Sequence, residues 1–131
     1  MPHSFACRVY YEDTDLAGIV YYANYLKFIE RARSEWVREL GIDQVALKAQ
    51  GLVFAVRRVE ADYLMAAKFD DMLVVKTKVE KITGSRIILT QDVSRDTQTL
   101  FHSVVTLVCL ADSGRPARIP ADIRAKMTAH T

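Results

Sequence analysis

The sequence predicts an α+β domain in which one long helix packs across an antiparallel β-sheet. Two observations lead to this fold class. Residues 22–40 have the apolar periodicity of a helix, and residues 52–111 alternate as strands that are joined by short turns. The chain has 131 residues, which is enough for one hydrophobic core but not for two. We therefore expect residues 1–131 to form a single domain.

The N-terminal elements are a strand, an acidic turn and the long helix. Residues 6–11 are rich in aromatic and β-branched side chains, which favours a strand. The run Glu12-Asp13-Thr14-Asp15 interrupts this pattern, and Ala17-Gly18 indicates a turn. Gly41 is expected to end the helix that follows, and residues 43–50 can form one or two further helical turns. The apolar face of the long helix is formed by Tyr25, Phe28, Ile29, Ala32, Trp36 and Leu40.

Four strands are expected after Gly51. In the first of them the alternation changes phase at Arg57 and Arg58, which predicts a β-bulge. The last strand is apolar on both faces toward its end, which predicts that it lies inside the sheet. Residues 120–127 can form a short terminal helix. The strands are expected over residues 52–63, 73–80, 87–93 and 100–111.

Composition and charge exclude several classes of partner. Lys and Arg number 18 and Asp and Glu 16, for a formal net charge of +2, and the two signs are interspersed. Without a basic face, nucleic acid is not an expected partner. Apolar runs such as residues 104–111 are too short to span a bilayer, and the first residues do not read as a secretion signal. Cys7 and Cys109 lack a ligand-like spacing, so we expect two reduced core cysteines in a cytoplasmic protein.

The acidic run Glu12-Asp13-Thr14-Asp15 has three candidate roles. Acidic residues commonly cap a helix or fill a surface turn. An Asp-x-Asp pair can also bind a metal, but such sites belong to doubly wound α/β domains, and the antiparallel pattern argues against one here. The third role is a single catalytic carboxylate beside a helix N-terminus, whose free N–H groups can polarise a carbonyl and stabilise an oxyanion. The order Asp15, glycine turn, Ile19-Val20 and helix start near Tyr22 fits this third role.

Residues 10–25 resemble the signature of the 4-hydroxybenzoyl-CoA thioesterase family. The segment reads YYEDTDLAGIVYYANY, and it is most similar to the YbgC-like branch, which is associated in bacteria with the Tol-Pal operon. Helix residues 28–33 and the Asp70-Asp71 turn are also similar to the family. The resemblance extends over nearly the whole chain, from Cys7 to Pro120.

This resemblance implies a hotdog fold, in which a bent antiparallel sheet wraps around a long central helix. It also implies hydrolysis of acyl-CoA thioesters, or of acyl carrier protein thioesters. Members of the family form homodimers or homotetramers, with active sites at the dimer interface. No metal or organic cofactor is expected, since CoA is part of the substrate.

The same resemblance assigns roles around the acidic turn. Asp15 matches the catalytic aspartate, which either attacks the thioester carbon or activates a water molecule. Tyr22 matches the residue whose backbone N–H polarises the thioester carbonyl. Many YbgC-like members carry His at the position of Tyr22, so any role of that imidazole is absent here. The substrate-binding positions are then Gly18 in the turn, Ile19 and Val20 beside the thioester, and Tyr25 in the wall of the acyl pocket.

Basic residues on two strand segments are the candidates for binding the CoA phosphates. Arg57 and Arg58 can reach the nucleotide, or can form a solvated strand edge instead. The benzoyl-CoA enzyme has a basic cluster on the hairpin that corresponds to residues 81–86. Of that cluster Lys81 and Arg86 remain in this sequence, with Ser85 between them.

Two other functions stay open at this level. A hydratase or dehydratase of enoyl thioesters shares the fold, but its site needs a His near an acid, and no His follows Asp15 before His102. A binding or scaffold module without turnover would also keep the fold, although the presence of Asp15 argues against it. Glu30 corresponds to a catalytic helix carboxylate in a related hotdog branch, and we interpret it here as part of a surface or interface salt bridge.

Overall fold

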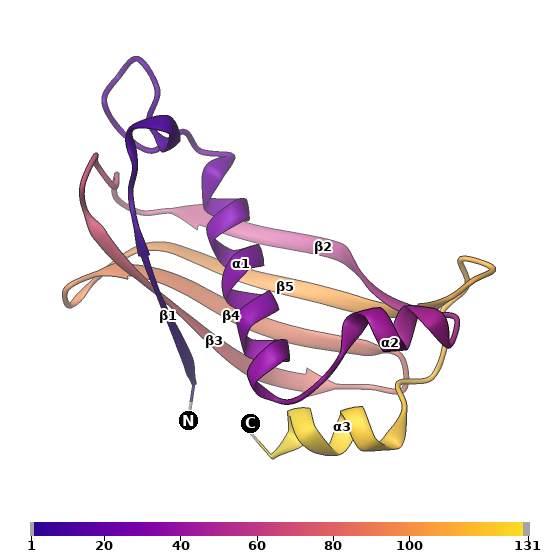
Figure 1. Ribbon diagram of the computed structural model, residues 1–131. Coiled ribbons are helices and arrows are strands. Elements are labelled where there is room, and N and C mark those ends of the chain that lie inside the picture. The colour runs from indigo at the N-terminus through magenta and orange to yellow at the C-terminus, as the bar shows by residue number, and fades with distance from the viewer. Residues whose placement is uncertain (1, 130–131) are drawn as a thin grey trace.

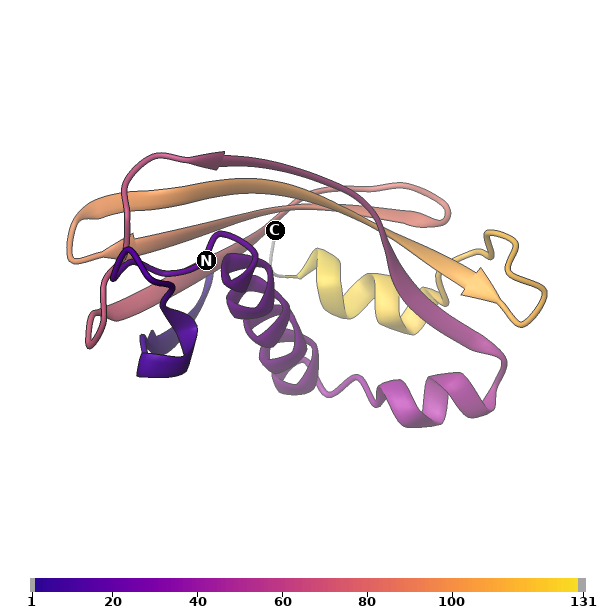
Figure 2. The same ribbon diagram turned by 90° about the horizontal axis from the view of Figure 1, so that it is seen from above.

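The computed structural model describes residues 2–129 and confirms the α+β hotdog fold. Five strands form one antiparallel sheet in the order β1-β3-β4-β5-β2. The sheet is bent, and the helices all lie on its concave side (Figure 1, Figure 2). The strands are β1 (His3–Arg8), β2 (Leu52–Tyr63), β3 (Met72–Ile82), β4 (Arg86–Arg95) and β5 (Gln98–Ala111). The helices are η1 (Tyr11–Asp13), α1 (Asn24–Glu39), α2 (Gln44–Ala49) and α3 (Ala121–Thr128).

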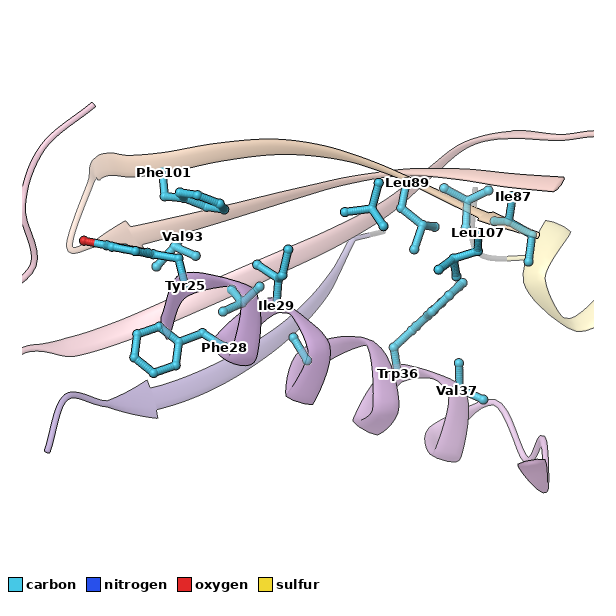
Figure 3. Close-up of a cluster of buried hydrophobic side chains, with 14 of the residues drawn as sticks. Tyr25, Phe28, Ile29, Trp36, Val37, Ile87, Leu89, Val93, Phe101 and Leu107 are labelled. Carbon is cyan, nitrogen blue, oxygen red and sulfur yellow. The ribbon is translucent and has the colours of Figure 1, made fainter. Parts of the chain in front are cut away.

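The hydrophobic core lies between α1 and the concave face of the sheet. The apolar face of α1 is buried as its periodicity predicts, except that Val37 is buried and Leu40 is only partly buried. Trp36 reaches toward Ile87 and Leu107 at one end of the helix, and Tyr25 faces the sheet at the other end (Figure 3). The predicted helix end is confirmed at Gly41, where φ is +78° and the N–H of Ile42 reaches back to the carbonyl of Val37.

The first strand lies three residues earlier than its composition predicts. It covers His3–Arg8, not residues 6–11, and pairs with β3 along the sheet edge. Tyr10 and Tyr11 are exposed, Tyr10 as the N-cap of η1 and Tyr11 as its first residue. The Asp13 carboxylate accepts a hydrogen bond from the Tyr10 N–H at 2.8 Å and so holds this turn. The chain therefore leaves the sheet at the acidic turn, before its strand-like composition ends.

The structure confirms the predicted bulge in β2 and the predicted inner position of β5. The register of β2 against β5 shifts between Val56 and Arg58, where the change of phase predicts a bulge. Strand β5 is paired on both sides, with β4 and with β2. The strand β2 is therefore one edge of the sheet, and β1 is the other edge. Within residues 2–129, no helix is long and apolar enough to cross a membrane.

Candidate active site

Asp15 lies at the start of a tight turn. Figure 1 shows the loop between η1 and α1 projecting beyond the sheet. Its N–H donates to the Ile19 carbonyl at 3.0 Å, and its own carbonyl accepts from the Gly18 N–H at 3.0 Å. Its carboxylate oxygen Oδ1 accepts from the Ala17 N–H at 2.9 Å. Gly18 has a φ of +81°, which is a conformation that side chains other than glycine adopt at a cost. The Asp15 side chain is exposed, and its Oδ2 accepts no hydrogen bond from any described residue.

Asp13 lies only two residues away but has a structural environment. It is buried, and its carboxylate accepts the Tyr10 N–H. Its backbone carbonyl accepts both the Tyr21 N–H and the Asn24 side-chain amide, each at 2.9 Å. Asp13 therefore joins the acidic turn to the first residues of α1.

Tyr22 occupies the entry to α1. The helix N-cap is Ala23, whose side chain cannot cap, and the N–H of Tyr22 donates to no acceptor within residues 2–129. Free N–H groups and the helix dipole give such a position a partial positive charge. The carbonyl of Tyr22 is instead occupied, because it accepts the hydroxyl of Tyr63 at 2.9 Å. Tyr22 is thus able to donate its N–H to a ligand while its carbonyl stays anchored.

An apolar cavity of about 330 Å³ opens at this helix terminus. Its wall combines the four predicted positions Ile19, Val20, Tyr22 and Tyr25 with Tyr63 and with the segment that follows β2. Tyr25 stacks on Phe101 with ring centroids 5.0 Å apart, and its hydroxyl accepts the N–H of Ala67 at 3.1 Å. The lining residues are Ile19, Val20, Tyr22, Tyr25, Tyr63, Leu64, Met65 and Ala66.

Tyr63 and residues 64–66 are the parts of this wall that the sequence does not predict. Tyr63 is the last residue of β2, and its ring makes edge contacts with Tyr25 at 5.5 Å and with Phe101 at 5.0 Å. An aromatic residue at the end of a strand is a weak signal, because only the pairing of β2 with β5 brings it to Phe101. Asp15 and Gly18 do not line the cavity, but Asp15 is hydrogen-bonded to Ile19, which does.

The predicted CoA-binding residues are not gathered around this cavity in a single chain. Arg57 and Arg58 lie near the middle of β2, and Arg58 pairs with Glu60 at 2.8 Å. Lys81, Ser85 and Arg86 belong to the hairpin between β3 and β4. Arg86 is paired with Val108, seven residues along β5 from Phe101, which corresponds to about 23 Å of strand. The hairpin is therefore at the opposite end of the sheet from the cavity.

Other reactive groups lie outside this region. Burial raises the pKa of both the Cys7 and the Cys109 thiol, so neither cysteine is a ready nucleophile, and both are free. His102 is hydrogen-bonded through Nδ1 to Asp92 at 2.6 Å, between neighbouring strands β4 and β5. Within residues 2–129, no group of three or more His, Cys, Asp or Glu residues is arranged to hold a metal ion.

Comparison with known proteins identifies the family. The model of the thioesterase-like superfamily matches residues 9–127. The chain is 43% identical over 125 residues to the acyl-CoA thioesterase YbgC of Haemophilus influenzae, and the match covers 93% of this chain and 91% of that protein. It is 38% identical over 121 residues to the acyl-CoA thioester hydrolase YbgC of Escherichia coli O6:H1, with 91% and 90% covered.

A solved structure supports the same assignment. The crystal structure of a probable thioesterase from Bartonella henselae superposes with a TM-score of 0.86 at 35% identity. That match covers 92% of this chain and the whole of the other chain, 100%. The chain belongs to the thioesterase-like superfamily and, within it, to the YbgC family of acyl-CoA thioesterases.

Proposed function

We propose that this protein hydrolyses acyl-CoA thioesters to a free acid and CoA. The observation that carries the proposal is the apolar cavity at the start of α1. Its wall contains Tyr22, whose N–H has no acceptor among residues 2–129, and Ile19, which is hydrogen-bonded to Asp15. We infer that an acyl group, the Tyr22 N–H that donates to its carbonyl, and the Asp15 carboxylate can meet at this end of α1. The YbgC relatives are named for the hydrolysis of acyl-CoA, which supports the same class of substrate.

In this mechanism the acyl group enters the cavity and its carbonyl oxygen accepts the N–H of Tyr22. Negative charge develops on that oxygen when the carbonyl carbon becomes tetrahedral. The N-terminus of α1 stabilises this charge more than it stabilises the neutral carbonyl, which lowers the barrier. The aromatic wall meanwhile excludes water from the acyl chain.

Asp15 promotes the attack on the thioester carbon. As a general base, its carboxylate takes a proton from a water molecule while the water oxygen bonds to that carbon. As a nucleophile, it bonds to the carbon itself and forms a mixed anhydride that water then hydrolyses. In both routes the carbon–sulfur bond breaks, the sulfur leaves with a proton as CoA, and no metal or organic cofactor takes part. The Oδ2 of Asp15, which accepts no hydrogen bond from the described part of the chain, supports both routes.

We propose further that the active protein is a homodimer, or a homotetramer built from two dimers. Strand β2 is a twelve-residue edge, and Val53, Val56 and Val59 on it are exposed. Such an edge is a template for pairing with a second copy. Two-fold antiparallel pairing of β2 would bring the β3–β4 hairpin of the second copy to the same end of the joined sheet as the cavity. Lys81, Ser85 and Arg86 of one copy could then meet the CoA held by the other.

The natural substrate is acyl-CoA or a thioester of acyl carrier protein, since both carry the same pantetheine thioester. We place the protein in the cytoplasm, and its two free cysteines support a reducing compartment. Arg57 and Arg58 are exposed on the paired edge, where they could contact the nucleotide of either copy.

The test of this function is the release of CoA from a panel of acyl-CoA substrates with short, long and aromatic acyl groups. Turnover of at least one of them, with a free acid as the second product, is the expected result. Binding of acyl-CoA without release of CoA would instead indicate a binding module. Addition of water to an enoyl-CoA without loss of CoA would indicate a hydratase.

A further inference from the structure

Tyr63 contacts the backbone just before α1 begins. In an α-helix the carbonyl of Tyr22 would accept the N–H of the residue four positions later, which is Leu26. Here the N–H of Leu26 donates to the carbonyl of Ala23 at 3.2 Å. The hydroxyl of Tyr63 takes its place and donates to the carbonyl of Tyr22 at 2.9 Å. Tyr22 precedes the N-cap Ala23, so a side chain of β2 anchors a carbonyl that the helix itself does not use.

The segment that carries the free N–H is therefore held from two sides. On one side the Asp13 carbonyl accepts the Tyr21 N–H and the Asn24 amide. On the other side Tyr63 holds the carbonyl of Tyr22. Neither contact uses the N–H of Tyr22, which has no acceptor within residues 2–129. Both contacts restrain the backbone at the point where a thioester oxygen would bind.

The ring of Tyr63 is itself fixed by its neighbours. It makes edge contacts with the rings of Tyr22, Tyr25 and Phe101, with centroids 6.2, 5.5 and 5.0 Å away. Tyr25 and Phe101 face each other in the core, as Figure 3 shows. Burial raises the pKa of the Tyr63 hydroxyl above its ordinary value, and the neighbouring phenols of Tyr22 and Tyr25 add to the effect. The hydroxyl therefore stays protonated, and able to donate, throughout the neutral range.

We propose that Tyr63 is a positioning residue for thioester hydrolysis, because its hydroxyl holds Tyr22 outside the helix and keeps the Tyr22 N–H available to the thioester oxygen. This inference rests on the proposed function. The Tyr63 side chain also forms part of the acyl cavity. The same residue therefore contacts the acyl group and fixes the position of the Tyr22 N–H that polarises the carbonyl. Its effect should be larger in the transition state than in the bound substrate, because the charge on the oxygen appears only there.

The decisive variant is Tyr63→Phe, which removes the hydroxyl and keeps the ring. We expect kcat to fall about tenfold or more, with KM within about twofold of wild type, because the acyl wall is unchanged. The control is Tyr11→Phe, which removes an exposed hydroxyl that has no hydrogen bond to any described residue and lies outside the proposed site. It should keep both kinetic constants. Tyr63→Leu, which also removes the ring, should raise KM in addition to lowering kcat.

A second readout does not depend on activity. Backbone NMR shifts of residues 22–26 should change in Tyr63→Phe but not in Tyr11→Phe, because loss of the Tyr63 hydroxyl leaves the carbonyl of Tyr22 able to accept the N–H of Leu26. If wild type releases no CoA, the proposed function fails, and the NMR shifts still test whether the Tyr63 hydroxyl holds the carbonyl of Tyr22. An active wild type with an unchanged kcat in Tyr63→Phe would overturn the inference alone. An unfolded Tyr63→Phe protein would overturn it too, since the hydroxyl would then be needed for folding.

Discussion

At the residue scale, the two aspartates of the acidic run have opposite environments. Asp13 is buried and accepts backbone N–H groups on both sides of the turn. Asp15 is exposed, and one of its carboxylate oxygens has no hydrogen-bond donor among residues 2–129. The tetrapeptide alone does not distinguish them, because either acid could cap or support a turn. Only the resemblance of residues 10–25 to a known family separates their roles in the sequence. The structure adds the contacts that make Asp13 a support.

Gly18 gives a prediction about the turn that carries Asp15. Its φ is +81°, and a Cβ at this position would meet no atom within 4 Å. The cost of Gly18→Ala is therefore backbone strain without a clash, and we expect a loss of about 1 kcal/mol in the free energy of unfolding. Chemical denaturation measures this loss. Gly84→Ala is the matched control, because Gly84 has equal space without a left-handed φ, and it should be neutral or slightly stabilising. If Gly18→Ala and Gly84→Ala changed the free energy of unfolding equally, the left-handed φ of Gly18 would not be the cause of the loss.

The ion pair of Asp71 and Arg95 gives a prediction about the loop behind the cavity. Their side chains are about three-quarters buried and lie 2.6 Å apart. Burial of Asp71 opposes its ionisation, but the Lys68 N–H and the Arg95 guanidinium outweigh it and hold the pKa of Asp71 below its usual value. Arg95→Met should lower the free energy of unfolding by about 1.5–3 kcal/mol at neutral pH.

The pH dependence of this loss has a definite sign. A carboxyl whose pKa is lowered by folding stabilises the protein above its unfolded pKa of about 3.9, and the contribution is lost as the pH falls through the folded pKa. The difference in the free energy of unfolding between wild type and Arg95→Met should therefore become smaller below about pH 4. Arg38→Met is the control, since Arg38 pairs with Glu35 at the surface and should cost at most about 1 kcal/mol. A difference between wild type and Arg95→Met that stays constant from pH 7 to pH 3 would contradict this explanation.

At the element scale, most of the fold could be predicted because each long element has a strong period. The apolar face of α1, the bulge at Arg58 and the enclosed position of β5 all follow from local patterns. Composition places the first strand too late in the chain, because Val9, Tyr10 and Tyr11 are strand-like residues while the Asp13 carboxylate binds the Tyr10 N–H in a turn. The wall formed by Tyr63 could not be predicted, since it depends on the pairing of β2 with β5 and on where α1 begins.

The β3–β4 hairpin gives a prediction about CoA. Charge reversal at Lys81 or Arg86 should raise KM more than it lowers kcat, because these groups would contact a part of the substrate that is remote from the thioester. CoA binding should also weaken as the salt concentration rises. Lys76→Glu is the control, since Lys76 is exposed on β3, the strand that carries Lys81, but lies five residues away from Lys81. If both hairpin variants keep the KM of wild type, the phosphates are bound elsewhere.

At the scale of the whole molecule, the open edge of β2 predicts assembly. An exposed twelve-residue edge with apolar side chains is a liability in a monomer, and pairing with a second copy removes it. Light scattering should therefore give at least twice the 14.8 kDa mass of one chain. A stable monomer at micromolar concentration would contradict both the edge pairing and a CoA site that is completed by a second copy.

The proposed activity of the whole molecule requires the Asp15 carboxylate, and the most direct test of this proposal replaces Asp15 with its nearly isosteric amide. Asp15→Asn should fold and assemble normally, since the amide oxygen can still accept the Ala17 N–H. It lacks the charge needed to attack the thioester carbon or to take a proton from water. We therefore expect kcat to fall about a hundredfold or more, equivalent to about 2.7 kcal/mol at the transition state, while KM changes little.

The measurement is CoA release by wild type, Asp15→Asn and Asp13→Asn with the best substrate of the acyl-CoA panel. Asp13→Asn is the control, because an amide oxygen can still accept the Tyr10 N–H that the buried carboxylate holds. It should lose some stability and keep most of its turnover. Loss of turnover in Asp15→Asn alone is the predicted result. Near-normal turnover in Asp15→Asn, with turnover abolished in Asp13→Asn, would contradict the assignment of the catalytic carboxylate.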